Sequence, residues 1–300
     1  MRFEYNKDSV NKALLWKDLS YSEEGTLADG RALLDQRDNP YLTNTGEGGG
    51  EAFSIIATKA FDNGVNLYAG YTNMEMEDAS RVASAQADSA YNKQPHDLAG
   101  ENLRAAPSDF MVDDKLIIGL DYTTQIFGTN DTRFSVLANR KSGRRYSLVY
   151  ETGDSEASIT DGNWEAYDLI YVPTGVNDPN VVFASDAVAS SVMNFLNSGC
   201  AAGFSGQIMT RNACKGDYAT RVDLRITQDF QVNDDQKIVI YFDIQNLINF
   251  LDDDKGWQTE IDTNSVSRAV SVDLDQTTDS GQLYITGVNE DAGLIYSTDY

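Results

Sequence analysis

The stretch Lys115–Thr124, KLIIGLDYTT, decides the fold class of this chain. Leu116, Ile118, Leu120 and Tyr122 are apolar or aromatic, and the residues between them include lysine, glycine, aspartate and threonine. A repeat of two residues over this length is typical of a β-strand with two different faces, not of a helix. The length also matches the roughly 9–11 residues with which a β-strand crosses a bilayer, apolar towards lipid and polar towards the barrel interior.

The same alternation recurs in five other segments, of which three are regular: Val65–Thr72, Arg221–Thr227 and Ile238–Gln245. In Thr132–Asn139 the polar face is interrupted by Leu137, and in Phe53–Phe61 it is interrupted by Ile56. Because alternation describes any sheet with one wet face, it leaves two classes open: a membrane barrel and a soluble antiparallel sandwich.

In a barrel, the alternation also predicts which residues face lipid and which face the lumen. The apolar set expected to face lipid is Leu116, Ile118, Leu120, Val222, Leu224, Ile226, Ile240 and Phe242. The charged set expected to face the lumen is Asp121, Arg221, Asp223, Arg225 and Asp243. A charge facing lipid costs about 2–4 kcal/mol at the middle of the bilayer, so the two sets should not exchange faces.

The connections between these segments alternate between short and long. The short ones are Asp62–Gly64, Phe127–Asp131 and Gln231–Gln236, and the long ones are Glu77–Asp114 and Ser142–Ala219. Asn63-Gly64 is a typical hairpin pair. Loops longer than about 12–15 residues are uncommon in compact soluble domains. Outer-membrane barrels, in contrast, have short periplasmic turns and long extracellular loops, so the connections favour a barrel.

Four aromatic residues lie beside the short connections: Phe61, Tyr122, Phe127 and Phe230. In a barrel they would form the girdle at the periplasmic boundary of the membrane. In a sandwich they would cover one end of the core.

The composition narrows the possible partners. The formal net charge of −24 repels nucleic acid and anionic lipid headgroups. No apolar run approaches the roughly 18 residues of a membrane helix, as expected for a β-barrel. The first residues, Met1–Tyr5, lack the apolar core of a secretory signal. We therefore expect that the chain is a fragment of an exported protein whose start lies upstream.

The sequence contains no recognisable set of catalytic residues. His96 is the only histidine, which excludes a histidine-based triad or metal site. Gly48–Gly50 lacks the lysine and hydroxyl residue of a phosphate-binding loop. Asp252–Gly256, DDDKG, resembles only the start of a calcium loop, so we expect a solvated acidic turn. We predict no catalytic residue, cofactor or metal site, and no enzymatic activity.

Cys200 and Cys214 are the only cysteines, and both lie in the long connection Ser142–Ala219. In an exported protein such a pair is most simply a disulfide, which would stabilise the fold by about 3 kcal/mol. In a cytosolic protein the same residues would be two free thiols.

The segment Asp243–Asn249, DIQNLIN, resembles the Asp-x-x-Asn-Leu-x-Asn pattern in the late strands of TonB-dependent outer-membrane receptors. Other segments resemble the Oar-like subgroup of these receptors. They are Thr26–Arg31 (TLADGR), Lys59–Thr72 (KAFDNGVNLYAGYT), Phe134–Tyr150 with its Ser-Gly-Arg-x-Tyr-Ser stretch, and Asn163–Pro173 ending in DLIYVP. The resemblance extends from near residue 1 to about residue 250. It rests on the order of these motifs along the chain.

The resemblance implies one part of a barrel of about 22 strands that takes up a scarce nutrient with energy delivered by TonB. The family's plug domain, TonB box and final strand have no counterpart in residues 1–300. We therefore expect an all-β, antiparallel and unclosed barrel segment of about six to eight strands in the cell outer membrane. Its partners would be outer-membrane lipid, the rest of the receptor and an unknown small ligand. It would reach TonB only through the missing N-terminal part.

Two alternatives remain open at this point. One is a passive, porin-like barrel without TonB coupling. The other is a soluble, secreted β-rich domain for adhesion or carbohydrate binding.

Overall fold

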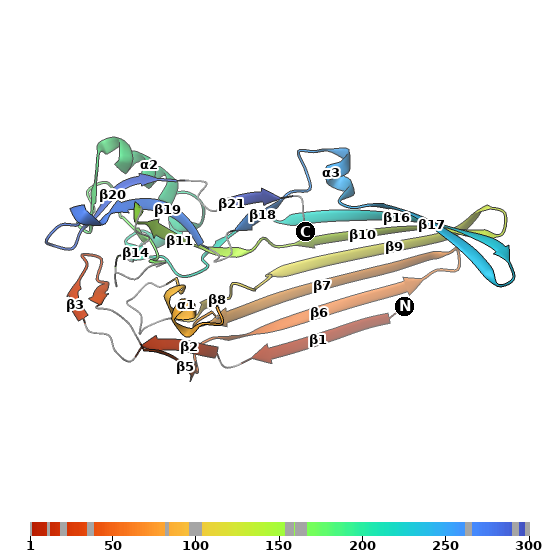
Figure 1. Cartoon of the computed structure of the whole chain (residues 1–300), viewed down its shortest axis with the longest axis horizontal. Coiled ribbons are helices and arrows are strands. Elements are labelled where there is room, and N and C mark those ends of the chain that lie inside the picture. Colours follow the sequence, from red (N-terminus) through yellow and green to blue (C-terminus); the bar gives the residue numbers. More distant parts are fainter. Residues whose placement is uncertain are drawn as a thin grey trace.

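The structure, a computed structural model, consists of one long antiparallel sheet with a group of shorter elements at one of its ends (Figure 1). It describes residues 2–10, 13–18, 23–34, 39–81, 84–95, 104–153, 159, 167–261, 266–289 and 294–297. Within these residues the protein is mostly β-structure, as the alternation predicts. No helix among them is both long and apolar enough to span a membrane.

The long sheet has the strand order β1-β6-β7-β9-β10-β16-β17, and every neighbouring pair is antiparallel. Its strands are β1 (Arg2–Val10), β6 (Gly49–Ala60), β7 (Val65–Asp78), β9 (Asp114–Phe127), β10 (Asn130–Lys141), β16 (Ala219–Asn233) and β17 (Gln236–Ile244), and the short β8 (Ala106–Pro107) pairs with β7. The strands β1 and β17 form the two edges. Six of the strands coincide with the six predicted segments. The sequence did not predict β1, because its charged residues obscure the alternation.

The turns and long connections lie at opposite ends of the long sheet, as predicted (Figure 1). The three hairpins β6–β7, β9–β10 and β16–β17 turn at one end, and the shorter elements gather at the other. At the first turn Gly64 has φ of +84°, and a Cβ there would lie 2.4 Å from the carbonyl oxygen of Thr123. Glycine is therefore required for β9 to approach this turn.

The pairing register divides the long sheet into an apolar and a polar face. Directly paired residues share a face, and Val136 pairs with both Leu120 and Leu224. On the other face, Ser135 pairs with both Asp121 and Arg225. Extended across the sheet, these rows put all eight residues predicted to face lipid on one side. The five charged residues all lie on the opposite side.

Two of the apolar residues on the polar face have a packing role. Leu137 pairs with Gly119, and Ile56 pairs with Gly70. Both glycines lie beside the ring of Tyr68, and a Cβ on Gly70 would be only 3.1 Å from the Tyr68 hydroxyl. Ile56, Tyr68 and Leu137 thus cover the places on the polar face where the glycines have no side chain.

The elements at the other end include a folded unit that we call the loop module. It consists of β11 (Arg145–Glu151), β12 (Tyr171–Val172), β13 (Val181–Phe183), α2 (Asp186–Leu196), the 3₁₀ helix η2 (Gly199–Phe204), β14 (Gln207–Ile208), β15 (Cys214–Lys215), β19 (Val266–Asp273), η3 (Leu274–Gln276) and β20 (Leu283–Val288). Its main sheet has the order β13-β20-β19-β11-β15. Small ladders pair β12 with β14, β2 (Ala13–Asp18) with β5 (Pro40–Thr45), β3 (Glu23–Thr26) with β4 (Ala32–Leu34), and β18 (Gln258–Ile261) with β21 (Leu294–Ser297). Two short helices are α1 (Ala87–Asn92) and α3 (Leu247–Leu251).

The loop module corrects two expectations. Ser142–Ala219 is not a simple loop, and the sheets are not all antiparallel, because β11 pairs with β19 and β13 with β20 in parallel. The physical reason is a hydrophobic core that joins distant segments, with Leu148, Leu196, Val270 and Ile285 all buried in it. The main core of the described residues therefore lies in the loop module and not in the long sheet.

The disulfide between Cys200 and Cys214 is confirmed, with a Cα–Cα distance of 5.1 Å. It ties η2 to β15, and Cys214 is itself buried in the core of the loop module. The bridge thus fastens the segment that follows α2 onto the main sheet of the module.

We predict that the disulfide contributes about 3 kcal/mol to the stability of the loop module, because it closes a short loop in the unfolded chain. Replacing both Cys200 and Cys214 by alanine should lower the urea midpoint measured by near-ultraviolet circular dichroism. Thiol titration of the unreduced protein should find no reactive cysteine; two reactive thiols would contradict the bridge.

Candidate functional site

The polar face of the long sheet carries a hollow of about 400 Å³ formed by β9, β10, β16 and β17. All five charged residues predicted from the sequence line it: Asp121, Arg221, Asp223, Arg225 and Asp243. The structure therefore brings together charged side chains that come from three different strands, β9, β16 and β17.

The charges in the hollow are arranged as pairs. The Arg225 guanidinium forms two hydrogen bonds with the Asp243 carboxylate, at 2.6 and 2.7 Å, across β16 and β17. On β16, Arg221 Nε donates to Asp223 Oδ1 at 2.7 Å. The Ser135 hydroxyl donates to the Asp121 carboxylate. Such exposed ion pairs contribute little to the free energy of folding. Their placement on one face instead makes that face suitable for contact with water.

The DIQNLIN motif ends β17 and fixes the turn that follows. Asn246 has φ of +51°, and its backbone N–H donates to Asp223 Oδ1 at 2.8 Å. Its side-chain amide donates to the carbonyl of Gly256 at 3.0 Å, and the amide of Asn249 donates to that of Lys255 at 2.8 Å. The asparagines thus hold α3 and the acidic turn against the end of the strand.

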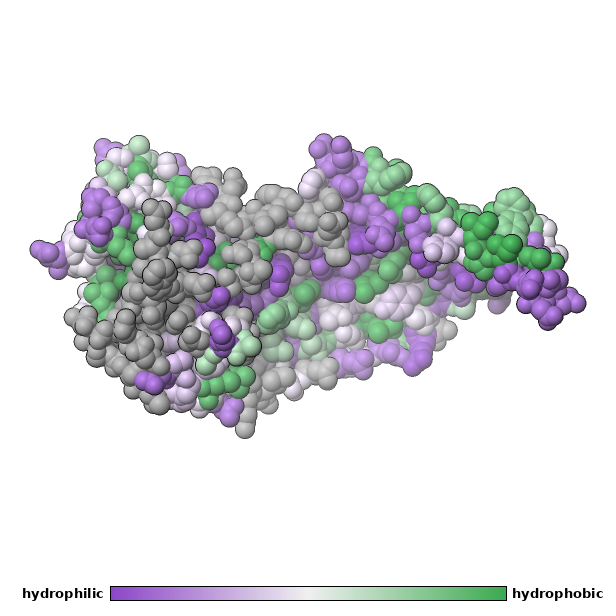
Figure 2. Space-filling view, viewed as in Figure 1, coloured by the Kyte–Doolittle hydropathy of each residue, from purple (hydrophilic) through white to green (hydrophobic). Residues whose placement is uncertain are grey.

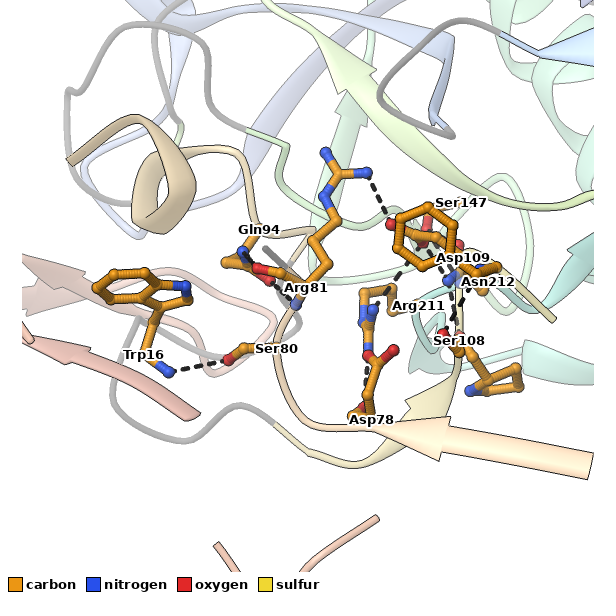
Figure 3. A network of polar contacts seen from close by, with 12 residues as sticks. Trp16, Asp78, Ser80, Arg81, Gln94, Ser108, Asp109, Ser147, Arg211 and Asn212 are labelled. Atoms are coloured by element: carbon orange, nitrogen blue, oxygen red, sulfur yellow. Dashed lines mark hydrogen bonds and ion pairs between the residues drawn. The ribbon is translucent and has the colours of Figure 1, made fainter. Parts of the chain in front are cut away.

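A second group of polar residues joins the long sheet to the elements beyond it (Figure 3). The buried carboxylate of Asp109 accepts a hydrogen bond from Arg81 Nη1 at 3.0 Å and one from Asn212 Nδ2 at 2.5 Å. Arg211, which is also buried, donates to the Asp78 carboxylate at the end of β7. We call these five residues the junction network. It contains two arginines and two aspartates, so its charges balance.

Four further hydrogen bonds lie at the junction between the long sheet and the loop module. The backbone N–H of Asn212 donates to Ser147 Oγ at 2.9 Å, and its side chain donates to the Pro107 carbonyl at 2.7 Å. Nearby, Arg145 forms two hydrogen bonds with Asp113, at 3.0 and 2.8 Å. Ser147 and Arg145 belong to β11, whereas Pro107 belongs to β8 and Asp113 precedes β9. The loop module is therefore attached to the long sheet through buried polar contacts.

Arg31, which lies in the connection between β1 and β6, contacts the same assembly. Its side chain is fully buried, its Nη1 donates to the Leu169 carbonyl at 2.8 Å, and its Nε donates to Asp29 at 2.9 Å. Burial lowers the pKa of the Arg31 guanidinium, but adjacent Asp29 and Tyr150 outweigh it and the pKa lies above its usual range. Burial raises the pKa of Tyr150 to about 12. The buried guanidinium is thus paired with the Asp29 carboxylate, which balances its charge.

Asp178 organises the turn between β12 and β13. Its carboxylate accepts hydrogen bonds from the Thr174 backbone at 2.7 Å, from the Tyr171 hydroxyl at 3.1 Å and from the Asn180 backbone at 2.8 Å. Burial would raise the pKa of Asp178, but these donors together hold it below its usual value. The carboxylate is therefore a fixed anion at the centre of the turn.

His96 lies outside the described residues. Asp252–Asp254 form the expected acidic turn at the surface, with carboxylate oxygens within 4.8 Å of one another, and Lys255 pairs with Asp252 at 2.6 Å. These three carboxylates lie close enough together to hold a metal ion.

No protein-family model matches this chain, and no curated protein or solved structure is significantly similar to it. The case for a function therefore rests on the geometry of the long sheet and the loop module.

Alternation did not reveal the junction network. Arg81, Asp109, Arg211 and Asn212 are isolated polar residues within long connections, where no local pattern distinguishes a buried arginine from an exposed one. Only the motifs gave a signal: Arg31 ends TLADGR, Leu169 lies in DLIYVP, and Ser147 ends the Ser-Gly-Arg-x-Tyr-Ser stretch. The contact between Arg31 and Leu169 joins two of those motifs directly.

We predict that Asp109→Asn destabilises the protein by about 3–5 kcal/mol, because it leaves buried arginine charge without its carboxylate. The urea midpoint of the full chain in detergent micelles measures the change. The matched control is Asp229→Asn, which removes the partner of the exposed Lys237 and should cost about 0–1 kcal/mol. Equal effects of the two substitutions would contradict a buried network.

We also predict an acid-dependent contribution from Asp178. Because its pKa is lower in the folded than in the unfolded protein, its stabilising effect is fully present above the ordinary value of 3.8 and is lost as the pH falls through the folded value. The gap in thermal midpoint between the protein and Asp178→Asn should therefore be largest at neutral pH and narrow below about pH 3.8. A gap that widens in acid would refute the assignment.

Proposed function

We propose that the chain is part of the barrel wall of a TonB-dependent outer-membrane receptor, with the loop module on the extracellular side. The observation that carries the proposal is the apolar face of the long sheet, which no described element covers. The polar face would line the lumen, and the loop module would present contacts to a small ligand. Transport would require the rest of the receptor, including its plug domain.

The exposure of the apolar face supports a lipid environment. Ile118 is 41% exposed, Ile55 is 46% exposed and Phe242 is 60% exposed, although all three lie on strands of an extended sheet. Large continuous apolar surfaces on water-soluble proteins are rare and prone to association. In a bilayer the same surface needs no cover. This argues against the soluble adhesion or carbohydrate-binding alternative.

The stagger of the hairpins supports a barrel. Val65, beside the first turn, pairs with Tyr122, which lies about five residues before β9 ends at Phe127. Tyr122 in turn pairs with Phe134 on β10, and Phe134 pairs with Ile226 on β16. Ile226 lies about seven residues before β16 ends at Asn233. Measured from this row of paired residues, each hairpin thus extends further towards its turn than the hairpin before it in the sequence. A progressive stagger of this kind accompanies the strand tilt that closes a sheet into a barrel.

The aromatic residues beside the short turns support a membrane boundary at that end. Phe61 and Phe127 are exposed, and the rings of Phe127 and Phe230 are 6.2 Å apart. Figure 2 shows apolar side chains gathered at the same end of the sheet, beside the hydrophilic tip of the β16–β17 hairpin. Aromatic girdles are typical of both boundaries of outer-membrane barrels. This end would be periplasmic, which leaves the loop module outside the cell.

The receptor assignment within the barrel class depends on the resemblance of the motifs. Its support from geometry is that these motifs act at the end where the loop module meets the sheet: DIQNLIN ends β17, and TLADGR contacts DLIYVP through Arg31. A receptor needs such a fixed relation between its ligand-contacting loops and its wall. A passive barrel would share the wall without needing the loops to be rigid.

We predict that Ile118→Arg blocks assembly into the outer membrane while Ile117→Arg is tolerated. The two isoleucines are neighbours on β9 but point to opposite faces: Ile118 pairs with Ala69 and Ala138, and Ile117 pairs with Gly70 and Asn139. An arginine facing lipid costs about 2–4 kcal/mol at mid-membrane. The amount of chain recovered in the outer-membrane fraction measures the difference, and equal recovery of the two variants would refute the proposed facing.

A further inference from the structure

A cavity of about 220 Å³ lies where the long sheet meets the loop module. The segment before β9 and the connection between β10 and β11 line most of it, with Phe110, Met111, Lys141 and Arg144 among its residues. It shares no lining residue with the polar hollow described above. The cavity is smaller than the roughly 300–1,000 Å³ of pockets for drug-sized molecules, so a ligand here would be small.

The pairing register places the cavity on the polar face of the long sheet. Lys141 on β10 pairs with Ala219 on β16, and both line the cavity. Two positions closer to the hairpin turns, Asn139 pairs with Arg221, which belongs to the charged set on the polar face. Residues two apart on a strand point to the same side, so Lys141 and Ala219 share that face. In the proposed receptor the cavity would therefore lie at the mouth of the lumen.

The charged groups around the cavity leave it positive. Among the described residues its lining includes two cations, Lys141 and Arg144, and one carboxylate, that of Asp109. The Asp109 carboxylate already accepts hydrogen bonds from Arg81 and Asn212 within the junction network (Figure 3). In the part of the chain that the structure describes, the exposed Arg144 guanidinium forms no hydrogen bond or ion pair. An arginine without a carboxylate, beside a second cation, is available to an anion.

The remaining wall of the cavity is largely apolar. Met111 and Ala219 are buried, and Phe110 is 73% exposed. The backbone N–H of Met76 on β7 donates to Met111 Sδ at 3.0 Å, which ties this part of the wall to the long sheet. Small-molecule sites typically combine apolar walls with a few polar groups that fix the orientation of the ligand. The exposed ring of Phe110 and the unpaired Arg144 form such a combination.

We infer that this cavity binds a small organic carboxylate, with its carboxylate on Arg144 and its apolar part against Phe110. A guanidinium is planar and binds a carboxylate through two parallel N–H donors, which fixes the orientation of the ligand. Lys141 adds attraction as a point charge. The role of the cavity as the entry site of a receptor rests on the proposed function, whereas the binding itself does not require a membrane.

The test is isothermal titration calorimetry of the full chain in detergent micelles with phenylacetate, after subtraction of a titration into protein-free micelles. We expect saturable binding that weakens about tenfold in Arg144→Gln, because a hydrogen-bonded charge is lost. Phe110→Ser should also weaken it. The neutral analogue phenylacetamide should bind the unaltered protein about tenfold less tightly than phenylacetate.

The matched control is Arg133→Gln, which removes the same charge from the same face of β10 near the hairpin turn. Arg133 pairs with Thr123, two positions from the pair of Ser135 with Asp121, and lies outside the cavity. Its binding of phenylacetate should equal that of the unaltered protein. Arg133 and Arg144 are both exposed, so both variants should keep the near-ultraviolet circular dichroism of the folded protein.

Several results would overturn the inference. These are the absence of saturable binding to the unaltered protein, equal binding by Arg144→Gln, and equal affinities for phenylacetate and phenylacetamide. Inorganic phosphate that binds as tightly as phenylacetate would refute a site with an apolar part.

The outcome is separable from that of the proposed function. If phenylacetate binds through Arg144 but Ile118→Arg and Ile117→Arg are recovered equally in the outer membrane, the site stands and the wall is refuted. If the recoveries differ as predicted but phenylacetate does not bind, the wall stands and the site is refuted.

Discussion

The pairing register between neighbouring strands decides where every side chain of the long sheet points, because a shift of one residue would turn a whole strand over. In this chain the register is consistent across β7, β9, β10, β16 and β17. The row from Asp121 through Ser135 and Arg225 to Asp243 is polar throughout, and the adjacent row from Leu120 through Val136 to Leu224 is apolar. The uncovered apolar face, the polar hollow and the proposed membrane location all depend on this agreement.

Alternation therefore allowed much of the long sheet to be predicted from the sequence. The six predicted segments became strands, the charged and apolar sets lie on opposite faces, and the short turns lie at one end. These features depend only on residues two positions apart in the sequence, so they can be predicted without knowledge of distant contacts. The disulfide was predictable for a different reason, since only two cysteines exist. The resemblance to TonB-dependent receptors remains a prediction.

The loop module was not predictable in the same way. Its core joins Leu148 on β11 with Val270 on β19 and Ile285 on β20, which lie far apart in the sequence, and two of its pairings are parallel. The junction network also joins residues that lie far apart in the sequence. Asp109 contacts Arg81 from its own connection and Asn212 from the connection Ser142–Ala219. Buried polar contacts of this kind are costly when incomplete, so they favour one relative placement of the parts. The loop module and the long sheet are thus joined as a defined unit, which suits a receptor whose binding surface must keep its position above the wall.

The central claim is that the long sheet faces lipid on one side and water on the other. The most direct measurement is a nitroxide scan of residues 115–124 on β9 in reconstituted vesicles, recording accessibility to oxygen and to a water-soluble relaxation reagent. The account predicts a period of two residues, with oxygen accessibility highest at Leu116, Ile118, Leu120 and Tyr122 and water-reagent accessibility highest at the positions between them. Accessibility to the water-soluble reagent at all ten positions would contradict it.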